Sequence, residues 1–159
     1  MDHWKLFRPQ ACLLSLSGAD KEAVLGALVD GLIAGGALEL GLRERALAAL
    51  VTRERVTSTG FGHGVAIPHV RVNGLVETAA SLSVLPGGCE WGAIDGEPVQ
   101  LVFTVLRPDR PTDRHDPERH LELMRWIARL ARSSDFRSFA LQARTRSALV
   151  DLLREMEAA

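Results

Sequence analysis

The sequence predicts an α/β (α+β) fold, a single domain with a mixed central β-sheet flanked by helices. Residues 99–106 (VQLVFTVL) form a nearly continuous apolar run, which is typical of a central strand covered on both faces. Two segments with helical periodicity precede the main group of strands, and three more follow it. Because strands and helices are grouped in this way along the chain, we expect the helices to pack against a mixed sheet.

The N-terminal third is expected to contain one strand and two helices. Residues 11–16 (ACLLSL) are a short apolar run that we interpret as a strand. Ser17 then offers an N-cap, with Asp20 three residues later at the positive end of a helix. Apolar residues recur at helical spacing as far as the glycine pair at 35–36, which should end this helix. A second helix is expected over about 42–53.

The rest of the chain should contain the sheet and the C-terminal helices. Residues 81–85 (SLSVL) alternate like a half-buried strand, and Asp95-Gly96 is a hairpin signal between this strand and 99–106. The segment 107–118 is rich in Pro, Arg and Asp, so we expect an exposed loop. Helices are then predicted at about 117–132, 134–142 and 145–157.

Length and composition narrow the function classes. The 159 residues are expected to form one domain, 1–159, whose core needs neither disulfides nor metal. The net charge of −1 gives no sign of a nucleic-acid partner. Because the N-terminus shows no signal-peptide pattern, we expect Cys12 and Cys89 to be reduced thiols. The most apolar helical stretch, 23–38, carries Asp30 and falls short of the roughly 20 apolar residues that span a bilayer. We therefore expect a cytoplasmic protein without membrane insertion.

His69 is the sharpest candidate for chemistry. It follows Pro68 at the end of the apolar segment FGHGVAIPHVR, residues 61–71. Proline removes a backbone donor, so the chain should leave the ladder there and display His69 at a strand end. A surface histidine in a loop is the alternative interpretation. His63 lies six residues earlier, roughly 20 Å away along a straight strand at about 3.3 Å per residue, which is too far for a hydrogen bond.

His120 is the second candidate, and we expect it to be the partner of His69. In the predicted helix RHLELMRWIARL it lies at the start of an apolar face that continues through Leu123, Met124 and Ile127. An inward-pointing imidazole needs a partner. A core histidine with a structural hydrogen bond remains the alternative.

Three further residues could bind an anion near His69. Arg53, at the end of the second helix, could grip an anionic group with its fork of donors, or be a solvated helix end. Ser58 and Thr59 could contact phosphate, or be ordinary turn residues. A metal site built from the histidines is disfavoured, since no His-x-x-x-His spacing occurs and no cysteine pattern accompanies them. A serine hydrolase is also disfavoured, because the sequence contains no Gly-x-Ser-x-Gly nucleophile elbow.

These segments resemble a known family. The stretch RERVTSTGFGHGVAIPH, ending at His69, closely resembles the active-site region of type-2 enzyme IIA domains of the bacterial sugar phosphotransferase system. This fructose/mannitol class also contains the nitrogen-regulatory proteins. The likeness continues through AIDGEPVQLVFTVL and HLELMRWIARLA and covers nearly the whole chain. It implies the mannitol-specific IIA-like fold.

The resemblance also implies a function and site roles. His69 corresponds to the phosphorylated nucleophile, His120 to the second histidine beside it, and Arg53 to the arginine that stabilises charge. A small phosphocarrier protein would donate the phosphoryl group, and a separate subunit or a regulatory target would receive or sense it, with no cofactor. Two positions depart from the family pattern: Val70 stands where a small residue, usually Gly, is found, and His63 where Asn, Glu or a similar polar residue is usual. A non-catalytic regulatory module with this fold is therefore the alternative function.

Overall fold

The computed structural model describes residues 2–18 and 20–159, and its sheet is built around one central strand. Strand β5 (Val99–Pro108) pairs antiparallel with β4 (Ala79–Cys89), with Ala79 opposite Leu106 and Val84 opposite Leu101. The loop between them contains a turn at 93–96, in which the Gly96 amide donates to the Ala93 carbonyl at 2.9 Å. The predicted central strand and its hairpin turn are therefore confirmed.

The other side of β5 carries an interrupted ribbon formed by the glycine-rich segment. Strands β1 (Gly60–Gly62) and β2 (Val65–Ala66) form a small antiparallel hairpin. Both β2 and β3 (His69–Val72) then run parallel to β5, with Val65 opposite Leu101 and His69 opposite Val105. The sheet thus contains both parallel and antiparallel pairs, as predicted.

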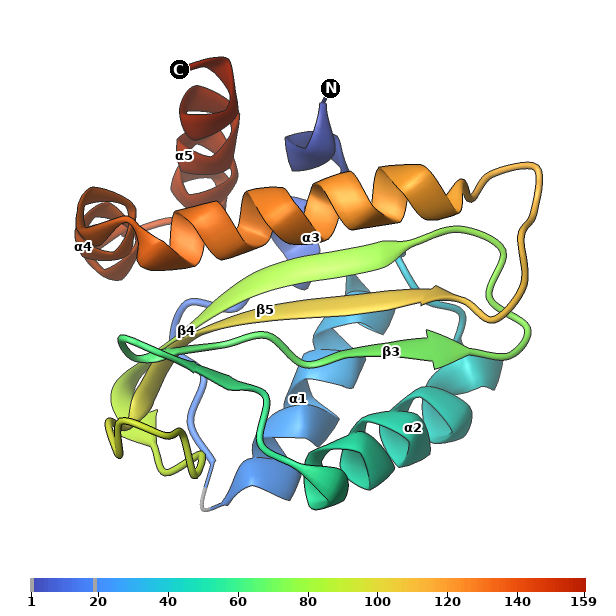
Figure 1. Ribbon diagram of the computed structural model, residues 1–159, viewed down its shortest axis with the longest axis horizontal. Coiled ribbons are helices and arrows are strands. Elements are labelled where there is room, and N and C mark those ends of the chain that lie inside the picture. The colour runs from blue at the N-terminus through green and yellow to red at the C-terminus, as the bar shows by residue number, and fades with distance from the viewer. Residues whose placement is uncertain (1, 19) are drawn as a thin grey trace.

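Helices cover both faces of this sheet. Figure 1 shows α1 (Lys21–Ala34) and α2 (Arg43–Val56) on one face, and α3 (Pro117–Arg132) with α4 (Ser134–Gln142) and α5 (Arg146–Ala158) on the other. Short 3₁₀ turns lie at His3–Leu6, Pro9–Ala11 and Leu40–Leu42. None of the helices in the described part of the chain has the length and apolarity needed to cross a membrane.

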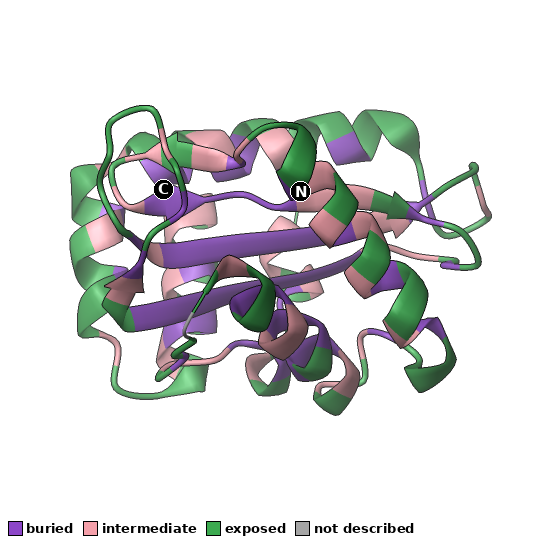
Figure 2. Ribbon diagram, turned by 90° about the horizontal axis from the view of Figure 1, so that it is seen from below, coloured by how far each residue is buried: buried purple, intermediate pink, exposed green. Residues whose placement is uncertain are grey.

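The strands are buried on both faces because each face has its own core. Leu101, Phe103 and Val105 of β5 pack with the cluster under α3, α4 and α5, whereas Val102 and Leu106 pack with α1 and α2. Figure 2 shows the long strands as almost continuously buried, while the outer faces of the helices are exposed. Because side chains alternate between faces, a strand between two cores is apolar at nearly every position.

The predicted strand at 11–16 is wrong. Its residues run along the free edge of β4, but only the Leu16 amide and the Leu13 carbonyl bond to the Val84 backbone. Side chains take over the neighbouring bonds: the Leu13 amide donates to Ser83 Oγ at 3.0 Å, and the Leu82 amide to Cys12 Sγ at 3.5 Å. A continuous ladder is therefore not formed.

The helix boundaries were predicted within a few residues, but the first cap was misassigned. Asp20, not Ser17, is the N-cap of α1, and its Oδ1 accepts from the Ala23 amide at 2.8 Å. Helix α2 continues three residues beyond the expected end at 53, and α5 begins one residue later than expected. The exposed loop predicted at 107–118 is shorter in the structure: only 109–116 connects β5 to α3, since β5 continues to Pro108 and α3 begins at Pro117, and His115 within it is buried.

Candidate functional site

The half-buried imidazole of His69 is held in one orientation at the start of β3. Its Nδ1 lies 2.7 Å from the carbonyl oxygen of Ile67. A carbonyl only accepts, so Nδ1 must carry a proton, and the lone pair of the neutral ring is on Nε2. The sequence alone did not indicate this contact, which leaves Nε2 as the nucleophilic atom.

Pro68 explains why the Ile67 carbonyl is available for this bond. The ribbon pairs with β5 through β2 and again through β3, and between these two stretches the Val105 amide donates to the Pro68 carbonyl at 3.0 Å. Proline supplies no amide, and the Ile67 carbonyl is left outside the ladder. Regular pairing is therefore interrupted just before His69, but it resumes at His69 itself, so the predicted exit of the chain from the ladder is only a break between β2 and β3.

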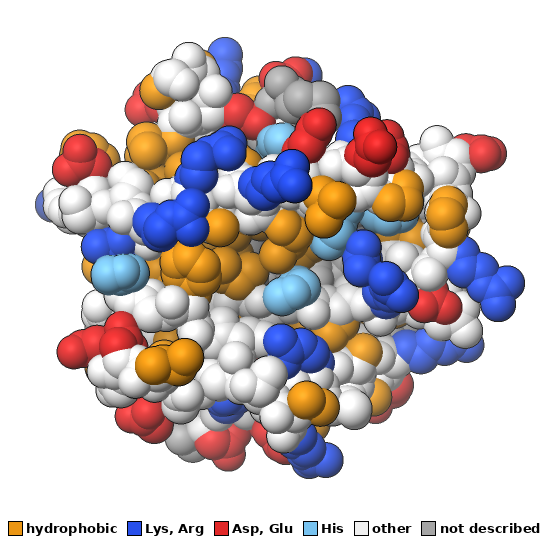
Figure 3. All heavy atoms as spheres, viewed as in Figure 1, with side chains coloured by type: hydrophobic (Ala, Val, Ile, Leu, Met, Phe, Trp, Pro, Cys, Tyr) orange, Lys and Arg blue, Asp and Glu red, His pale blue; other side chains and the backbone are white. Residues whose placement is uncertain are grey.

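Three arginines lie with His69 around one depression between α2 and β3. The depression has a volume of about 620 Å³, and its lining includes Arg53, Arg71 and Arg107, together with Val70. Figure 3 shows this side of the molecule, where basic side chains (blue) and histidines (pale blue) lie among exposed hydrophobic side chains (orange). The lining contains no carboxylate, so the surroundings of His69 favour an anion.

Arg71 and Arg107 were missed by sequence reasoning. They are opposite each other in the parallel pair β3–β5, and neither forms an ion pair within residues 2–18 and 20–159. Burial, and then the charge of Arg71, lowers the pKa of Arg107. Two like charges on neighbouring strands repel each other, so a bound anion would relieve a native repulsion. Only the register of two strands 36 positions apart could have revealed the pair.

Arg53 lies in the last turn of the second helix and also lines the depression that holds His69, while its contact with an anion stays a prediction. Its Nη1 donates to the Thr57 carbonyl at 2.8 Å and so caps the C-terminal end of α2. The same half-buried side chain lines the depression that holds His69. The helix therefore fixes the guanidinium near the histidine.

Ser58 and Thr59 are engaged in a buried network behind this site. Ser58 Oγ donates to the Trp91 carbonyl at 2.9 Å, and Thr59 Oγ1 donates to Glu54 while accepting from Trp91 Nε1 at 3.1 Å. Glu54 in turn pairs with Lys21 at 2.9 Å. Neither hydroxyl lines the depression. A phosphate contact by either residue stays a prediction, and it would require the hydroxyl to leave its present partner.

His120 is buried, as predicted, and its charged form is disfavoured. Burial, followed by the charges of Arg107, His115, His69 and Arg71, lowers its pKa from 6.5 to about 4. His120 therefore lies close enough to His69 for their charges to interact, but no hydrogen bond joins the rings and they line separate depressions. The expected partnership of the two histidines stays a prediction that this proximity supports.

His63 lies at the far end of the ribbon from His69. It is the exposed turn residue between β1 and β2, with a φ of 58°, and its amide donates to Asp95 Oδ2 at 2.9 Å. Along β5, the pairing partners of Val65 and His69 are already four residues apart, and His63 precedes Val65. The ribbon does bend at the glycines, but this bend directs His63 toward the β4–β5 loop.

Comparison with known proteins identifies the family. Residues 5–156 match the family described as phosphoenolpyruvate-dependent sugar phosphotransferase system, EIIA 2. The chain belongs to this family. The resemblance noted for the segment that ends at His69 is thereby confirmed, and this type-2 enzyme IIA chain can be set beside its relatives.

Relatives and solved structures agree with this assignment. A nitrogen regulatory protein of Pseudomonas aeruginosa is 33% identical over 153 residues, which cover 96% of this chain and 95% of that protein. Nitrogen regulatory protein IIA-Ntr from Neisseria meningitidis has the same fold, with a TM-score of 0.82 at 23% identity over 94% of this chain and 97% of that one. Enzyme IIAMTL of Escherichia coli, solved in complex with phosphorylated enzyme IIBMTL, also has this fold. Its TM-score is 0.69 at 17% identity, over 92% of this chain and 95% of that one. The predicted mannitol-specific IIA-like fold is confirmed.

Proposed function

We propose that this type-2 enzyme IIA domain carries a phosphoryl group on Nε2 of His69 and passes it on or uses it as a regulatory signal. The observation that carries the proposal is the 2.7 Å contact between His69 Nδ1 and the Ile67 carbonyl, beside three arginines. It leaves one ring nitrogen free to attack and surrounds it with positive charge.

The transfer step balances without a base. The lone pair of His69 Nε2 attacks the phosphorus of a donor phosphohistidine; the new N–P bond forms as the donor N–P bond breaks, and its electron pair returns to the donor ring. Nδ1 keeps its proton, so the phosphorylated His69 ring gains positive charge. The Ile67 carbonyl stabilises that charge. A protonated ring is also a good leaving group, which suits a carrier that must release phosphate again.

The arginines would supply most of the electrostatic stabilisation. Phosphoryl transfer depends mainly on alignment and on positive charge around the equatorial oxygens. Arg53 is fixed by its bond to Thr57, whereas Arg71 and Arg107 have no carboxylate partner among the described residues. We assign Arg53 to charge stabilisation, as its family position implies, and add Arg107 as a second contributor.

The partners are proposed from the family. A small phosphocarrier protein would be the phosphoryl donor, and the protein would work in the cytoplasm as a phosphoryl-transferring component. The solved complex of enzyme IIAMTL with phosphorylated enzyme IIBMTL shows one kind of acceptor for that relative. The similarity to a nitrogen regulatory protein favours a regulatory target for this chain.

Phosphate uptake tests the proposal directly. The wild-type chain, incubated with a radiolabelled phosphorylated phosphocarrier, should gain one acid-labile, base-stable phosphate, and ³¹P NMR should place it on Nε2. His69→Ala and His69→Gln should take up none, while His63→Asn should label like the wild type. Undiminished labelling of either His69 variant would overturn the assignment.

The non-catalytic alternative depends on Val70. This half-buried residue follows His69, lines the same depression and packs against the core formed with α1 and α2. A β-branched side chain there narrows the approach to His69. If the wild-type chain takes up no phosphate but Val70→Gly does, the protein acts as a binding module whose carrier function is blocked at this position.

A further inference from the structure

We propose that His115 is a positioning residue for His120: its ring packs against the His120 ring and fixes that ring beside the phosphorylation site. The proposal rests on the proposed function, because it concerns the second histidine of the same site. His115 lies in the Pro- and Arg-rich loop between β5 and α3, which sequence reasoning treated only as an exposed connection.

The His115 ring of this loop packs against the His120 ring of α3. Their centroids are 6.2 Å apart with an interplanar angle of 60°, an edge-to-face arrangement. Both residues are buried, with 9% of His115 and 7% of His120 exposed. A buried histidine in a loop whose other residues are mostly exposed is unusual, so the loop is folded inward at this position.

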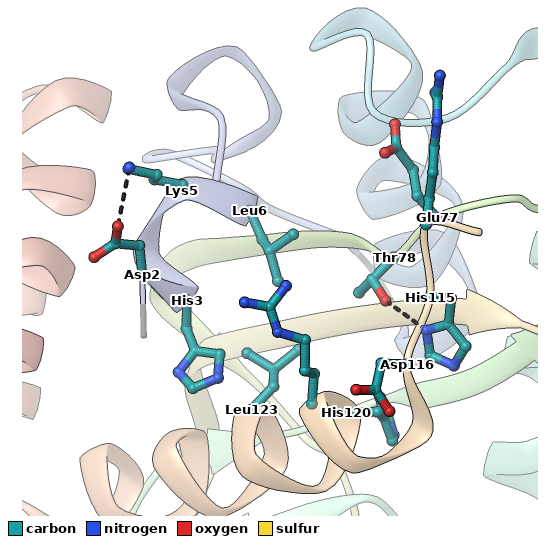
Figure 4. A pocket seen from close by; sticks show the side chains of 12 residues that line it. Asp2, His3, Lys5, Leu6, Glu77, Thr78, His115, Asp116, His120 and Leu123 are labelled. Carbon is teal, nitrogen blue, oxygen red and sulfur yellow. Dashed lines mark hydrogen bonds and ion pairs between the residues drawn. The ribbon is translucent and has the colours of Figure 1, made fainter. Parts of the chain in front are cut away.

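His115 is itself anchored on two sides. Its Nδ1 lies 3.4 Å from Thr78 Oγ1, next to the start of β4, and its amide donates to the Thr112 carbonyl at 3.3 Å. Thr112 Oγ1 in turn donates to the carbonyl of Val76. Figure 4 shows His115 next to Thr78 and to the start of α3, where the N-cap residue Asp116 and His120 lie. The loop is therefore tied to the segment before β4 and holds the His115 ring in place.

The His120 ring lacks the hydrogen bond that usually orients a buried histidine. Its Nδ1 is enclosed and has no hydrogen-bond partner among the described residues, whereas Nε2 is not among the enclosed, unpartnered atoms. The backbone of His120 is fixed, since its amide donates to the Asp116 carbonyl at 3.1 Å. The ring orientation is thus left to packing, and His115 provides the aromatic contact.

The surroundings of His120 explain why this contact would matter for function. Basic groups come from β3 (His69, Arg71), from β5 (Arg107) and from the loop (His115). The depression that His120 lines, with a volume of about 440 Å³, adds charges of both signs from the N-terminal turn, from Glu77, and from Arg114, Asp116 and Arg119. The His115 ring, which lines the same depression, covers part of His120 there. Removing it would let water reach His120 and loosen the ring.

The test compares two variants in the unphosphorylated protein. We expect His115→Ala to move the ¹⁵N and ¹H ring signals of His120 and to raise its pKa toward 6.5, because the ring becomes hydrated. His115→Phe keeps an aromatic ring at the same position, so the ring signals and the pKa of His120 should stay close to those of the wild type. His63→Asn, at the far end of the ribbon, is the matched control and should change neither. A dispersed amide spectrum shows that each variant is folded.

Transfer kinetics provide the second measurement. His115→Ala should slow phosphate uptake roughly tenfold or more at saturating phosphorylated phosphocarrier, since a displaced group loses alignment, and His115→Phe should restore the rate. Unchanged His120 signals in His115→Ala, or a His115→Phe variant that behaves like His115→Ala, would overturn the proposal. If the wild type takes up no phosphate at all, the proposed function fails, while the ring signals still decide whether His115 positions His120.

Discussion

The five histidines of the chain occupy four kinds of environment. His3 pairs with Glu157 at 2.8 Å, His63 is an exposed turn residue, and His69 is bonded to a backbone carbonyl. His115 and His120 are buried against each other. The chemistry available to an imidazole depends on which nitrogen is engaged and on how well the ring is hydrated. Only His69 among them lines the depression with the three arginines.

At the residue scale, we expect His120, not His63, to influence His69. His120→Ala removes a ring on which the charge of His69 acts, so it should shift the ring NMR signals of His69 and slow phosphate uptake. His63→Asn should do neither. Asn tolerates the positive φ of this position, so the turn should keep its shape. A shift with His63→Asn and none with His120→Ala would reverse the assignment.

A second residue-scale prediction distinguishes a specific role of Arg53 in phosphoryl transfer from the effect of losing any positive charge on α2. Arg53→Ala should slow phosphate uptake by roughly 100-fold or more, as expected when a preorganised group that stabilises the transition state is lost. Arg55→Ala, two residues along the same helix, removes the same charge from an exposed pair with Glu22 and should have little effect on the rate. Equal rates for the two variants would leave Arg53 as a helix cap alone.

At the scale of elements, the site depends on how α3 begins. Asp116 is the N-cap of this helix, its Oδ1 accepts from the Glu118 amide at 3.0 Å, and its carbonyl accepts from the amide of His120. Asp20 is the N-cap of α1 on the opposite face of the sheet; its Oδ1 accepts from the amide of Ala23, three residues on, whereas Asp116 accepts from the amide two residues on. Both caps are aspartates, but only the helix capped by Asp116 carries a predicted site residue.

The two caps therefore form a matched pair for mutation. Asp116→Ala and Asp20→Ala should each lower the free energy of unfolding by about 1 kcal/mol, measured by urea denaturation. Only Asp116→Ala should also slow phosphate uptake, because it loosens the turn that holds His120. A similar slowing in Asp20→Ala would mean that the loss of activity reflects stability in general.

At the scale of the whole molecule, the sheet separates two cores, and the histidine cluster lies at the edge of one of them. A buried imidazole with a lowered pKa links folding to pH. Between pH 6.5 and about 4 the unfolded chain binds a proton at His120 that the folded chain does not. Stability therefore rises with pH across this window, and it is lost as the pH falls from 6.5 toward 4. His115, whose pKa is also lowered, chiefly by burial, acts in the same direction.

This linkage gives the fourth prediction. Lowering the pH from 7 to 4.5 should reduce the free energy of unfolding, with roughly 1 to 3 kcal/mol of the loss due to His120, since one pKa unit corresponds to about 1.4 kcal/mol. The His120→Gln variant should show a correspondingly shallower pH dependence in urea unfolding. Asp95, whose pKa is lowered by hydrogen bonds from the His63 and Glu97 amides, titrates below this range. An identical pH dependence in wild type and variant would show that His120 is protonated equally in both states.

Much of this architecture could be predicted because local patterns report local structure. The apolar run at 99–106, the inward position of His120 and the break in strand pairing at Pro68 each follow from a periodicity or from the covalent geometry of one residue. The strand predicted at 11–16 failed because a run of apolar residues shows that a segment is buried, but not whether its amides bond to a strand or to side chains. The Ser17 cap failed for a related reason, since two nearby oxygens could both accept and only the path of the chain selects Asp20.

The sequence by itself determined the family, the sheet with helices on both faces, and the presence of His69 at a strand end, because these depend on the order and periodicity of side chains along the chain. The tertiary structure alone decided which groups meet. The pairing of β3 with β5 places Arg71 against Arg107, the free Ile67 carbonyl fixes the proton on His69, and the folded loop brings His115 onto His120. Each of these contacts joins groups whose approach depends on strand register or on the path of the loop. Neither the strand register nor the path of the loop is encoded in the spacing of residues.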